Sequence, residues 1–266
     1  MAAFDHTSGK HFEIDDAAIY FHRIPNRGKP TLLFLHGGGG TIEDFNQILH
    51  DFTDDFDVLG IDSRGHGASS VGSGKLSYER LQRDVEAILK SLDISSVTIV
   101  GFSDGGIVGY RLASDDKIII DKLITIGGTW SKKDLRETKH LLESFTVSKW
   151  RELMPEAFST YQKTNPEKDA RKSLEKIISM WTDDSDSGYP DSSVEKIKCP
   201  TLIIRGDEDH LFSRESAFRL AESIADSKLL NIPFAAHVAF VDQKEIILQI
   251  ITQFLKQHTN ANDQEN

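Results

Sequence analysis

The chain has 266 residues, of which 38% are hydrophobic and 27% are charged, and its formal net charge is −11. This length and composition fit a folded globular protein with one core, or one core plus an insertion, and argue against disorder. The acidic balance, without a basic cluster, argues against nucleic acid as a partner, because phosphate binding requires concentrated Lys and Arg. No apolar run approaches the roughly 20 residues that cross a bilayer, so no membrane association is expected.

The cysteine content and the two ends of the chain carry further expectations. Cys199 is the only cysteine, so no intrachain disulfide can form and a cysteine-based metal site is not expected. The segment Met1–His6 lacks the basic and then apolar layout of a signal peptide, which predicts a cytoplasmic location. The tail 259–266 is polar and has no periodicity, and we expect it to be disordered.

Short apolar runs rich in β-branched residues alternate with amphipathic stretches along most of the chain. This alternation is typical of an α/β protein, in which parallel strands are joined by helical crossovers that cover both faces of the sheet. The first two predicted strands are short enough to form an edge hairpin. In chain order, the predicted strands are His11–Ile14, Ala18–His22, Thr31–Leu35, Asp57–Ile61, Ser96–Phe102, Lys122–Ile126, Thr201–Arg205 and Lys228–Ile232.

Two of the predicted helices have clear sequence patterns. Apolar residues within Leu81–Leu92 recur at helical spacing, which predicts one buried helix face. The last helix is predicted to begin with a capping box of Asp242 and Glu245 and a hydrophobic staple of Val241 and Ile246. Its buried stripe is predicted to contain Ile247, Ile250, Ile251 and Phe254.

The segment 131–195 interrupts the alternation, because it contains no convincing strand. Two groups of apolar residues in it recur at helical spacing, and each group must bury its face against another part of the protein. We therefore predict an all-helical insertion on the top of the sheet, with residues 1–130 and 196–258 forming the core domain. The two groups are Trp150, Leu153, Met154, Phe158 and Tyr161, and Leu174, Ile177, Ile178 and Trp181.

The strongest local signal is Gly101-Phe102-Ser103-Asp104-Gly105, which follows a predicted strand and precedes an amphipathic helix. Such a sequence also arises by chance in glycine-rich turns. At a strand-to-helix junction, however, it predicts a sharp turn in which residues without a Cβ clear the neighbouring strand and helix. The turn lifts the serine hydroxyl above the sheet, at the positive end of a helix. Ser103 is therefore the candidate nucleophile.

One histidine and four glycines, residues 36–40, directly follow the strand Thr31–Leu35. Acyl transfer develops negative charge on a carbonyl oxygen, and a pre-aimed backbone N–H group can stabilise it by about 3 kcal/mol. We assign two such donors to Gly38 and to Asp104, the residue after the nucleophile. A phosphate cradle is the alternative for the glycine run, but no Gly-Lys-Ser/Thr follows it. His36 is expected to brace this loop rather than to act as a base.

A hydroxyl nucleophile needs a base, and the base needs an orienting carboxylate. His237 follows the last predicted strand, and Asp209 follows the strand Thr201–Arg205. Both residues therefore lie at the carboxyl ends of parallel strands, where such sheets place their active sites. The chain order of Ser103, Asp209 and His237 also fits this kind of sheet better than the two other familiar orders of the trio.

Other acidic residues and histidines compete for these two roles. Asp207 is the second candidate for the acid, whereas Glu208 is expected to be solvated. His210, His66 and His22 are alternative bases. His210 directly follows the proposed acid and would have difficulty facing it, so a packing or surface role is expected for it.

Four ordered motifs and His237 resemble the α/β-hydrolase superfamily over about residues 31–255. The motifs are HGGGG at 36–40, DSRGHG at 62–67, GFSDGG at 101–106 and GDED at 206–209. The resemblance implies an α/β-hydrolase fold, a mostly parallel eight-stranded sheet with helices on both faces and a helical cap inserted between the sixth and seventh strands. That cap matches the segment 131–195. The DSRGHG motif is interpreted as structural, with Gly65 and Gly67 making a turn that Arg64 and His66 hold.

The serine at position 103 narrows what the resemblance implies. Haloalkane dehalogenases and epoxide hydrolases of this fold place Asp there, so Ser103 favours esterases, lactonases, thioesterases, amide hydrolases or carbon–carbon hydrolases. The Ser-Asp-Gly-Gly sequence is similar to that of valacyclovir-hydrolase-like enzymes, which act on esters of α-amino acids. By this resemblance Asp104 would attract a substrate cation, and capping of the following helix is the alternative role.

The sequence therefore predicts a serine hydrolase that cleaves a small-molecule carboxylic ester, lactone or thioester through an acyl-enzyme, with no metal or organic cofactor. Its pocket is expected between sheet and cap, although the aromatic residues there would equally serve as the core of the cap. Two other classes stay open, a ligand-binding or signalling protein on the same scaffold and a lyase that uses the trio to abstract a proton. The candidate pocket residues are Trp130, Trp150, Phe158 and Trp181.

Overall fold

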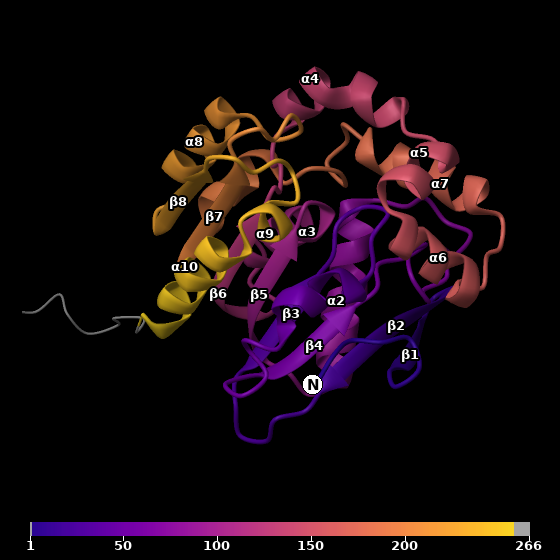
Figure 1. Cartoon of the computed structure of the whole chain (residues 1–266), viewed down its shortest axis with the longest axis horizontal. Helices are drawn as coiled ribbons and strands as arrows, with labels where there is room; N and C mark the ends of the chain where they lie inside the picture. The colour runs from indigo at the N-terminus through magenta and orange to yellow at the C-terminus, as the bar shows by residue number, and fades with distance from the viewer. Residues whose placement is uncertain (1, 258–266) are drawn as a thin grey trace, which may run out of the picture.

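One mixed sheet of eight strands organises residues 2–257, which the computed structural model describes (Figure 1). The strand order is β1-β2-β4-β3-β5-β6-β7-β8, and the pairs from β4 to β8 are parallel, whereas β1–β2 and β2–β4 are antiparallel. The predicted edge hairpin is therefore confirmed. The strands are β1 Lys10–Ile14, β2 Ala17–Ile24, β3 Thr31–Leu35, β4 Asp57–Ile61, β5 Ser96–Phe102, β6 Ile119–Ile126, β7 Thr201–Gly206 and β8 Ser227–Ile232.

Helices cover both faces of this sheet, as predicted. Successive residues of a strand point to opposite faces, so Leu32 and Leu33 of β3 belong to two different hydrophobic cores. Helices α2, α3 and α8 supply apolar side chains to the core that contains Leu33, and α1 and α10 supply those of the other. The core helices are α1 Asn46–Leu49, α2 Tyr78–Ser91, α3 Asp104–Ala113, α8 Arg214–Ser223, α9 Ala239–Asp242 and α10 Lys244–Lys256, with short 3-10 helices at Ile42–Phe45 (η1) and Asp191–Lys196 (η2).

The segment between β6 and β7 forms the cap, and its four α-helices lie above one end of the sheet (Figure 1). Ser131 and Thr146 cap the first two of these helices by accepting bonds from the amides of Asp134 and Lys149, which satisfies N–H groups that have no partner within the helix. Asn165 of the cap donates to the carbonyls of Gly67 and Ser69. The cap helices are α4 Lys132–Glu143, α5 Val147–Leu153, α6 Pro155–Thr164 and α7 Ala170–Trp181.

The predicted start of the last helix is wrong. Residues 239–242 form the separate short helix α9, and α10 begins after Gln243 without a side-chain cap. The carboxylate of Asp242 accepts a bond from the Ala236 amide instead, so it is not available for a capping box. Val241 and Ile246 are both exposed and form no staple. The buried stripe of α10 is present at Ile247, Ile251 and Phe254.

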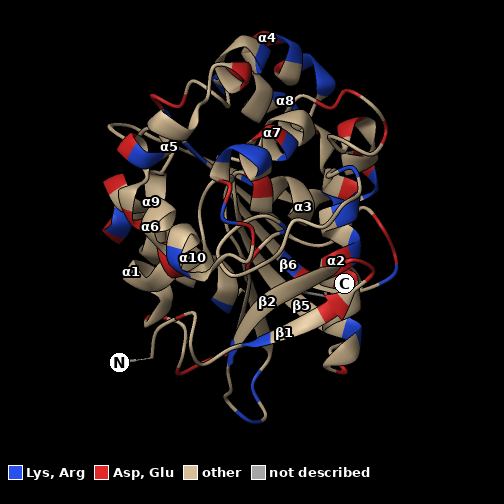
Figure 2. Cartoon of the chain, turned by 90° about the vertical axis from the view of Figure 1, so that its right-hand side faces the viewer, with Lys and Arg blue, Asp and Glu red and all other residues tan. Residues whose placement is uncertain are grey.

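Charged residues of both signs are interspersed over the surface. Figure 2 shows Lys and Arg beside Asp and Glu on the cap and on the helices that flank the sheet. Within residues 2–257, none of the helices has the length and apolar character needed to span a membrane. The predicted disordered tail 259–266 lies outside the described residues.

Candidate active site

Ser103 occupies the sharp turn between β5 and α3, with φ 48° and ψ −113°. A positive φ in a residue with a Cβ is strained by about 1–3 kcal/mol and persists only where its surroundings enforce it. Two glycines do so here. A Cβ at Gly105 would overlap the Leu35 carbonyl oxygen, and one at Gly101 would overlap the carbonyl of Gly105. The amide of Ser103 also donates to the Ile126 carbonyl at 2.8 Å, so the turn is fixed on both sides.

The structure brings Ser103, His237 and Asp209 together, although they lie far apart along the chain. Ser103 Oγ is 3.0 Å from His237 Nε2, and His237 Nδ1 is 2.9 Å from Asp209 Oδ2. Both distances are within hydrogen-bond reach. When Nδ1 carries the ring proton and donates it to the carboxylate, Nε2 is free to accept the proton of the serine hydroxyl.

Asp209 lies in an environment that keeps it ionised. Its side chain is buried, and Oδ1 accepts bonds from the amides of Leu211 at 2.9 Å and Phe212 at 3.2 Å. Burial alone would raise the pKa of Asp209, but the charge and hydrogen bond of His237 and these two amides lower it below its usual value. A carboxylate that stays charged can orient the imidazole and stabilise its protonated form.

The loops that carry Asp209 and His237 contact each other directly through their backbones. The amide of Glu208 donates to the Ala235 carbonyl at 2.9 Å. Gly206 lies so close to the second loop that a Cβ there would overlap the carbonyl oxygens of Ala235 and Ala236. The Ala236 amide, one residue before the histidine, is held by Asp242 at 2.8 Å. These contacts fix the separation of Asp209 and His237.

Arg205 is a supporting residue that the sequence analysis missed. Its side chain is buried, and it donates to the carbonyls of Phe212 at 2.8 Å and Asp209 at 3.1 Å and to Oδ1 of Asn231 at 2.5 Å. These bonds hold the loop that carries Asp209. The available signal was a charged residue at the end of an otherwise apolar strand, directly before the GDED motif.

The competing acidic residues lie elsewhere. Asp207 forms an ion pair with Arg214 and accepts a bond from Asn231 at 2.8 Å. Glu208 is exposed to solvent. Neither carboxylate is bonded to His237, because the turn of the loop directs only Asp209 toward it.

The competing histidines have other partners. His210 is exposed. His66 is buried and its Nδ1 bonds the Arg64 carbonyl at 2.9 Å. His22 accepts a bond from the Asp5 amide at 3.1 Å. Of the histidines in residues 2–257, His237 is the one whose ring is hydrogen-bonded to Ser103.

The glycine loop, residues 36–40, lies beside Ser103. A Cβ at Gly37 would be 3.1 Å from the Ser103 Cβ. The Gly37 carbonyl accepts bonds from the Gly40 amide at 3.0 Å and from His36 Nδ1 at 2.7 Å. In a trans peptide the N–H points opposite to the C=O, so these bonds direct the N–H of Gly38 away from the interior of the turn. This geometry suits the assigned oxyanion donor.

His36 links this loop to a neighbouring one. While Nδ1 bonds Gly37, Nε2 accepts a bond from the Ser63 amide at 2.9 Å. Burial is the main cause that lowers the pKa of His36, which favours a neutral ring that can donate and accept at the same time. The hydrogen bonds of His36 therefore agree with the bracing role that the sequence predicts.

The N-terminal segment holds, through a second histidine, the 3-10 helix η1 that follows the glycine loop. Asp62 accepts bonds from the amides of Ile42 at 3.0 Å and Ala68 at 2.9 Å, and from His6 Nε2 at 2.7 Å. His6 Nδ1 lies 2.8 Å from Glu43. Burial alone would lower the pKa of His6, but its bonds with the two carboxylates raise it to about 10. Nothing near His6 in the chain indicates these ion pairs.

Asp104 follows Ser103 and is buried. Its Oδ1 accepts a bond from the Tyr78 hydroxyl and its Oδ2 from the Trp181 indole, both at 2.7 Å. Burial raises the pKa of Asp104, and the two donors oppose that shift. The alternative prediction, that the Asp104 side chain caps α3, is therefore wrong, because its two oxygens bond Tyr78 and Trp181 instead. Asp104 does lie in the first turn of α3.

A family model described as the alpha/beta hydrolase fold matches residues 30–161, a range that contains the sharp turn at Ser103 and the glycine loop. The chain belongs to the α/β-hydrolase superfamily. It is 25% identical to the AB hydrolase superfamily protein YisY of Bacillus subtilis, over 92% of this chain and 98% of that one. It is also 25% identical to 3-oxoadipate enol-lactonase 2 of Acinetobacter baylyi, over 91% and 94% of the two chains.

A solved structure of a hydrolase from Pseudomonas aeruginosa has the same fold, with a TM-score of 0.75 at 23% identity, over 95% of this chain and 100% of that one. The eight strands, the helices on both faces and the inserted cap therefore follow the α/β-hydrolase plan.

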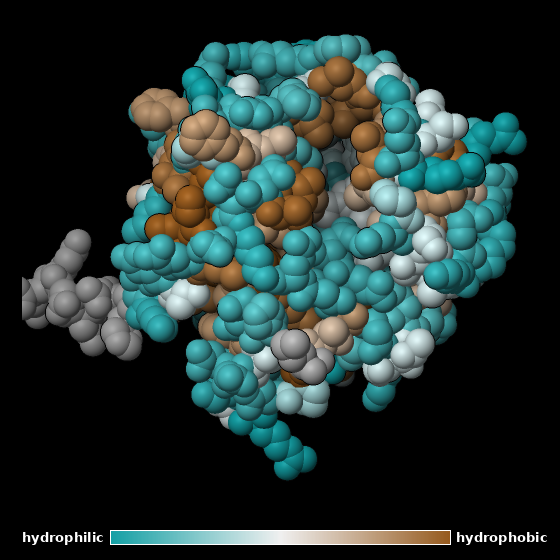
Figure 3. All heavy atoms as spheres, viewed as in Figure 1, coloured by the Kyte–Doolittle hydropathy of each residue, from teal (hydrophilic) through white to brown (hydrophobic). Residues whose placement is uncertain are grey.

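The four aromatic residues predicted to line the pocket of this α/β-hydrolase are all buried. Trp150 and Phe158 pack together with Tyr161 in a separate hydrophobic cluster of the cap. Trp130 donates to Ser216 Oγ at 3.0 Å. Their role as pocket residues stays a prediction. Figure 3 shows a hollow between the cap and the core, bordered partly by hydrophobic residues.

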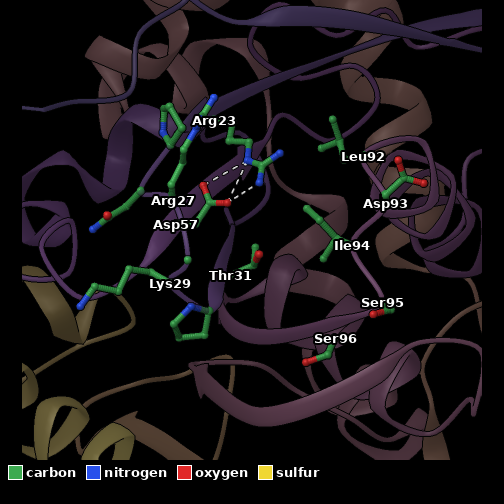
Figure 4. A pocket seen from close by; sticks show the side chains of 14 residues that line it. Arg23, Arg27, Lys29, Thr31, Asp57, Leu92, Asp93, Ile94, Ser95 and Ser96 are labelled. Carbon is green, nitrogen blue, oxygen red and sulfur yellow. Dashed lines mark hydrogen bonds and ion pairs between the residues drawn. The ribbon is translucent and has the colours of Figure 1, made fainter.

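A separate pocket of 470 Å³ lies at the opposite end of the sheet (Figure 4). Thr31, Asp57 and Ser96, which begin β3, β4 and β5, contribute to its wall. Arg23 in this pocket is already paired with Asp57. Ser103 follows the carboxyl end of β5, whereas this pocket surrounds the amino ends, so it takes no part in the candidate active site.

Proposed function

We propose that this α/β-hydrolase is a serine hydrolase that cleaves a small carboxylic ester, lactone or thioester through an acyl-enzyme. The observation that supports the proposal is the continuous hydrogen-bonded chain from Asp209 through His237 to Ser103. A relative named as an enol-lactonase supports the choice of an ester or lactone bond. The expected partner is a small molecule, and a cytoplasmic location stays a prediction from the sequence.

In the proposed mechanism His237 removes the proton of Ser103 as the hydroxyl oxygen attacks the carbonyl carbon. The amides of Gly38 and Asp104 stabilise the oxyanion that forms. His237 then gives its proton to the leaving group, and water, activated by the same ring, releases the acyl group. Asp209 stays ionised throughout and stabilises the imidazolium.

We further propose a division into a core domain, residues 1–130 and 196–258, and a cap, residues 131–195. The absence of strands between β6 and β7 within the described residues supports this division. The cap lies over the carboxyl ends of β3 and β5, because Trp150 and Trp181 bond residues that follow these two strands. The substrate would therefore bind between the two units.

Turnover of p-nitrophenyl acetate and butyrate tests the proposal. The wild type is expected to hydrolyse both, and Ser103→Ala is expected to lower kcat at least about 10⁴-fold, because the nucleophile is lost. Ser192→Ala, at an exposed serine of η2, is the matched control and should retain full activity. Rapid quenching followed by mass spectrometry should detect an acyl adduct on Ser103.

The other two classes give different results in the same experiment. A ligand-binding protein on this scaffold would show no turnover that depends on Ser103. A lyase that uses the trio only to abstract a proton would show no acyl adduct on Ser103 at any quench time. Either result would contradict the hydrolase proposal.

Asp104→Asn tests whether this residue selects cationic substrates. If an ionised Asp104 attracts an ammonium group, kcat/KM should fall at least about tenfold more for an α-amino-acyl ester than for a neutral ester of the same length. Asn keeps the shape and an acceptor for Tyr78 or Trp181. Equal losses on both esters would remove cation selection and leave Asp104 as a partner of the cap.

A further inference from the structure

Trp181, the last residue of α7, contacts both residues that carry the proposed oxyanion donors. Its indole Nε1 donates to Asp104 Oδ2 at 2.7 Å. Its ring also packs against Gly38 so closely that a Cβ there would overlap Cζ2 of the indole. The carboxylate of Asp104 lies next to Gly38 as well, since the same Cβ would be 2.7 Å from Oδ2. One cap side chain therefore spans the two donor residues.

A second cap tryptophan holds the glycine loop one residue further along. Trp150 Nε1 donates to the Gly39 carbonyl at 2.7 Å. The indole is 1% exposed and is wedged against Phe158 and Tyr161, with ring centroids 5.3 and 5.0 Å away. Gly39 has a φ of 75°, a conformation that glycine adopts without strain. The loop is thus held by a buried cap residue at a glycine, which has no side chain of its own to restrain the backbone.

We propose that Trp181, assisted by Trp150, is a positioning residue that sets the geometry of the oxyanion hole, so that the cap completes the catalytic site. The inference rests on the proposed hydrolase function and extends it. Oxyanion donors contribute only when they are held in place before the charge develops. A run of four glycines does not supply this rigidity by itself. Two buried indole N–H groups do, because a buried donor that leaves its acceptor loses a hydrogen bond that water cannot replace.

Three roles of Trp181 give three different kinetic signatures. A residue that only lines the pocket changes KM and the preference for acyl length. A residue that only stabilises the cap lowers Tm and leaves kcat of the folded enzyme unchanged. A residue that positions oxyanion donors changes kcat, because the lost interaction is stronger in the transition state than in the bound substrate.

The experiment compares Trp181→Phe and Trp150→Phe with Tyr161→Phe, on p-nitrophenyl acetate and on the thionoester O-(4-nitrophenyl) thioacetate. Tyr161→Phe is the matched control, because it keeps the ring that packs against Trp150 and removes only a hydroxyl, which bonds Ser173 and Glu167 inside the cap and reaches neither donor residue. Sulfur accepts hydrogen bonds more weakly than oxygen, so an intact oxyanion hole favours the oxygen ester. A damaged hole lowers the ratio of the two rates.

For Trp181→Phe we expect kcat on the ester to fall about ten- to a hundredfold, KM to stay within about twofold, and the ester-to-thionoester ratio to fall. Trp150→Phe should show the same pattern with a smaller amplitude, and it carries the test if Trp181→Phe does not fold. Tyr161→Phe should lose thermal stability and keep both kcat and the ratio. Trp181→His, which retains a ring N–H, should recover part of kcat.

Several outcomes would overturn the inference. They are an unchanged kcat in the folded tryptophan variants, a change confined to KM, or a loss in Tyr161→Phe as large as in Trp181→Phe. Each of these leaves the hydrolase proposal intact as long as the wild type turns over in a Ser103-dependent way. A wild type without such turnover would overturn both proposals.

Discussion

The two sides of the candidate site are held in different ways. On the side of the base, the acid and histidine loops contact each other through backbone atoms, with Gly206 against the carbonyls of Ala235 and Ala236. On the oxyanion side, side-chain hydrogen bonds link the glycine loop to distant parts of the chain. His36 reaches Ser63, and Trp150 reaches Gly39.

This difference predicts how each side responds to substitution. Backbone contacts require the absence of a side chain, so one added methyl group should disturb them. Side-chain contacts depend on particular donors and charges, so they should respond to deletion of a donor and to pH. Both sides should therefore respond to added volume, since a Cβ at Gly38 would overlap Trp181, and the support of the oxyanion side should respond to the loss of a side-chain donor as well.

The largest expected effect is that of Asp209→Asn. The amide cannot stabilise the imidazolium and favours the wrong ring tautomer, so kcat should fall about 10³- to 10⁴-fold, with the fold intact by circular dichroism. Asp207→Asn is the matched control, since Asp207 pairs with Arg214 at the surface, and kcat should stay within about threefold. An equal loss in the two variants would reassign the acid.

Gly206→Ala tests the backbone contact between the two loops. The new Cβ must displace the carbonyls of Ala235 and Ala236, which should lower the free energy of unfolding by about 3 kcal/mol and reduce kcat by moving His237 from Asp209. Gly74→Ala is the control, because a Cβ there meets no atom within 4 Å, and it should change stability by less than about 0.5 kcal/mol. Urea titrations measure the free energy of unfolding of both variants. Equal stability of the two variants would show that the loops separate without cost.

The smallest expected effect concerns His6, whose ion pairs with Asp62 and Glu43 hold the segment that follows the glycine loop. Because its pKa in the folded protein, about 10, is above the usual 6.5, its stabilisation is fully present below about pH 6.5. It is lost as the pH rises through about 10. His6→Gln should lower the free energy of unfolding by about 2 kcal/mol at pH 6.5 and by less at pH 10.

Urea titrations at several pH values between 6 and 10 check this prediction. His140→Gln, at an exposed position of α4, is the control and should follow the wild type at every pH. A constant difference between His6→Gln and the wild type across this range would show that the charge of His6 does not contribute.

The parts of the molecule that the sequence predicted are those with local causes. The sharp turn at Ser103 is specified by two glycines within two residues of it, and the strands are specified by continuous apolar runs. The glycine loop and the loops of Asp209 and His237 directly follow such strands, so the sheet topology brings them to one edge. The geometry at this edge agrees with the predicted trio.

The parts that sequence reasoning missed depend on contacts between distant residues. Nothing around His6 indicates that it meets Asp62, and nothing around Trp181 indicates that its indole bonds Asp104. The predicted start of the last helix is wrong for the same reason, because the Ala236 amide donates to the Asp242 carboxylate that was expected to cap the helix. A local pattern shows which residues are able to bond, whereas the tertiary fold decides with which partner.

The strained backbone at Ser103 has a consequence for engineering this protein. Glycine adopts a positive φ freely, so Ser103→Gly would relieve the strain and raise the melting temperature while it removes the reactive oxygen. A library sorted for heat resistance alone would therefore enrich an inert enzyme. Durability and turnover compete at this single residue, and directed evolution of the chain needs selection for both at every round.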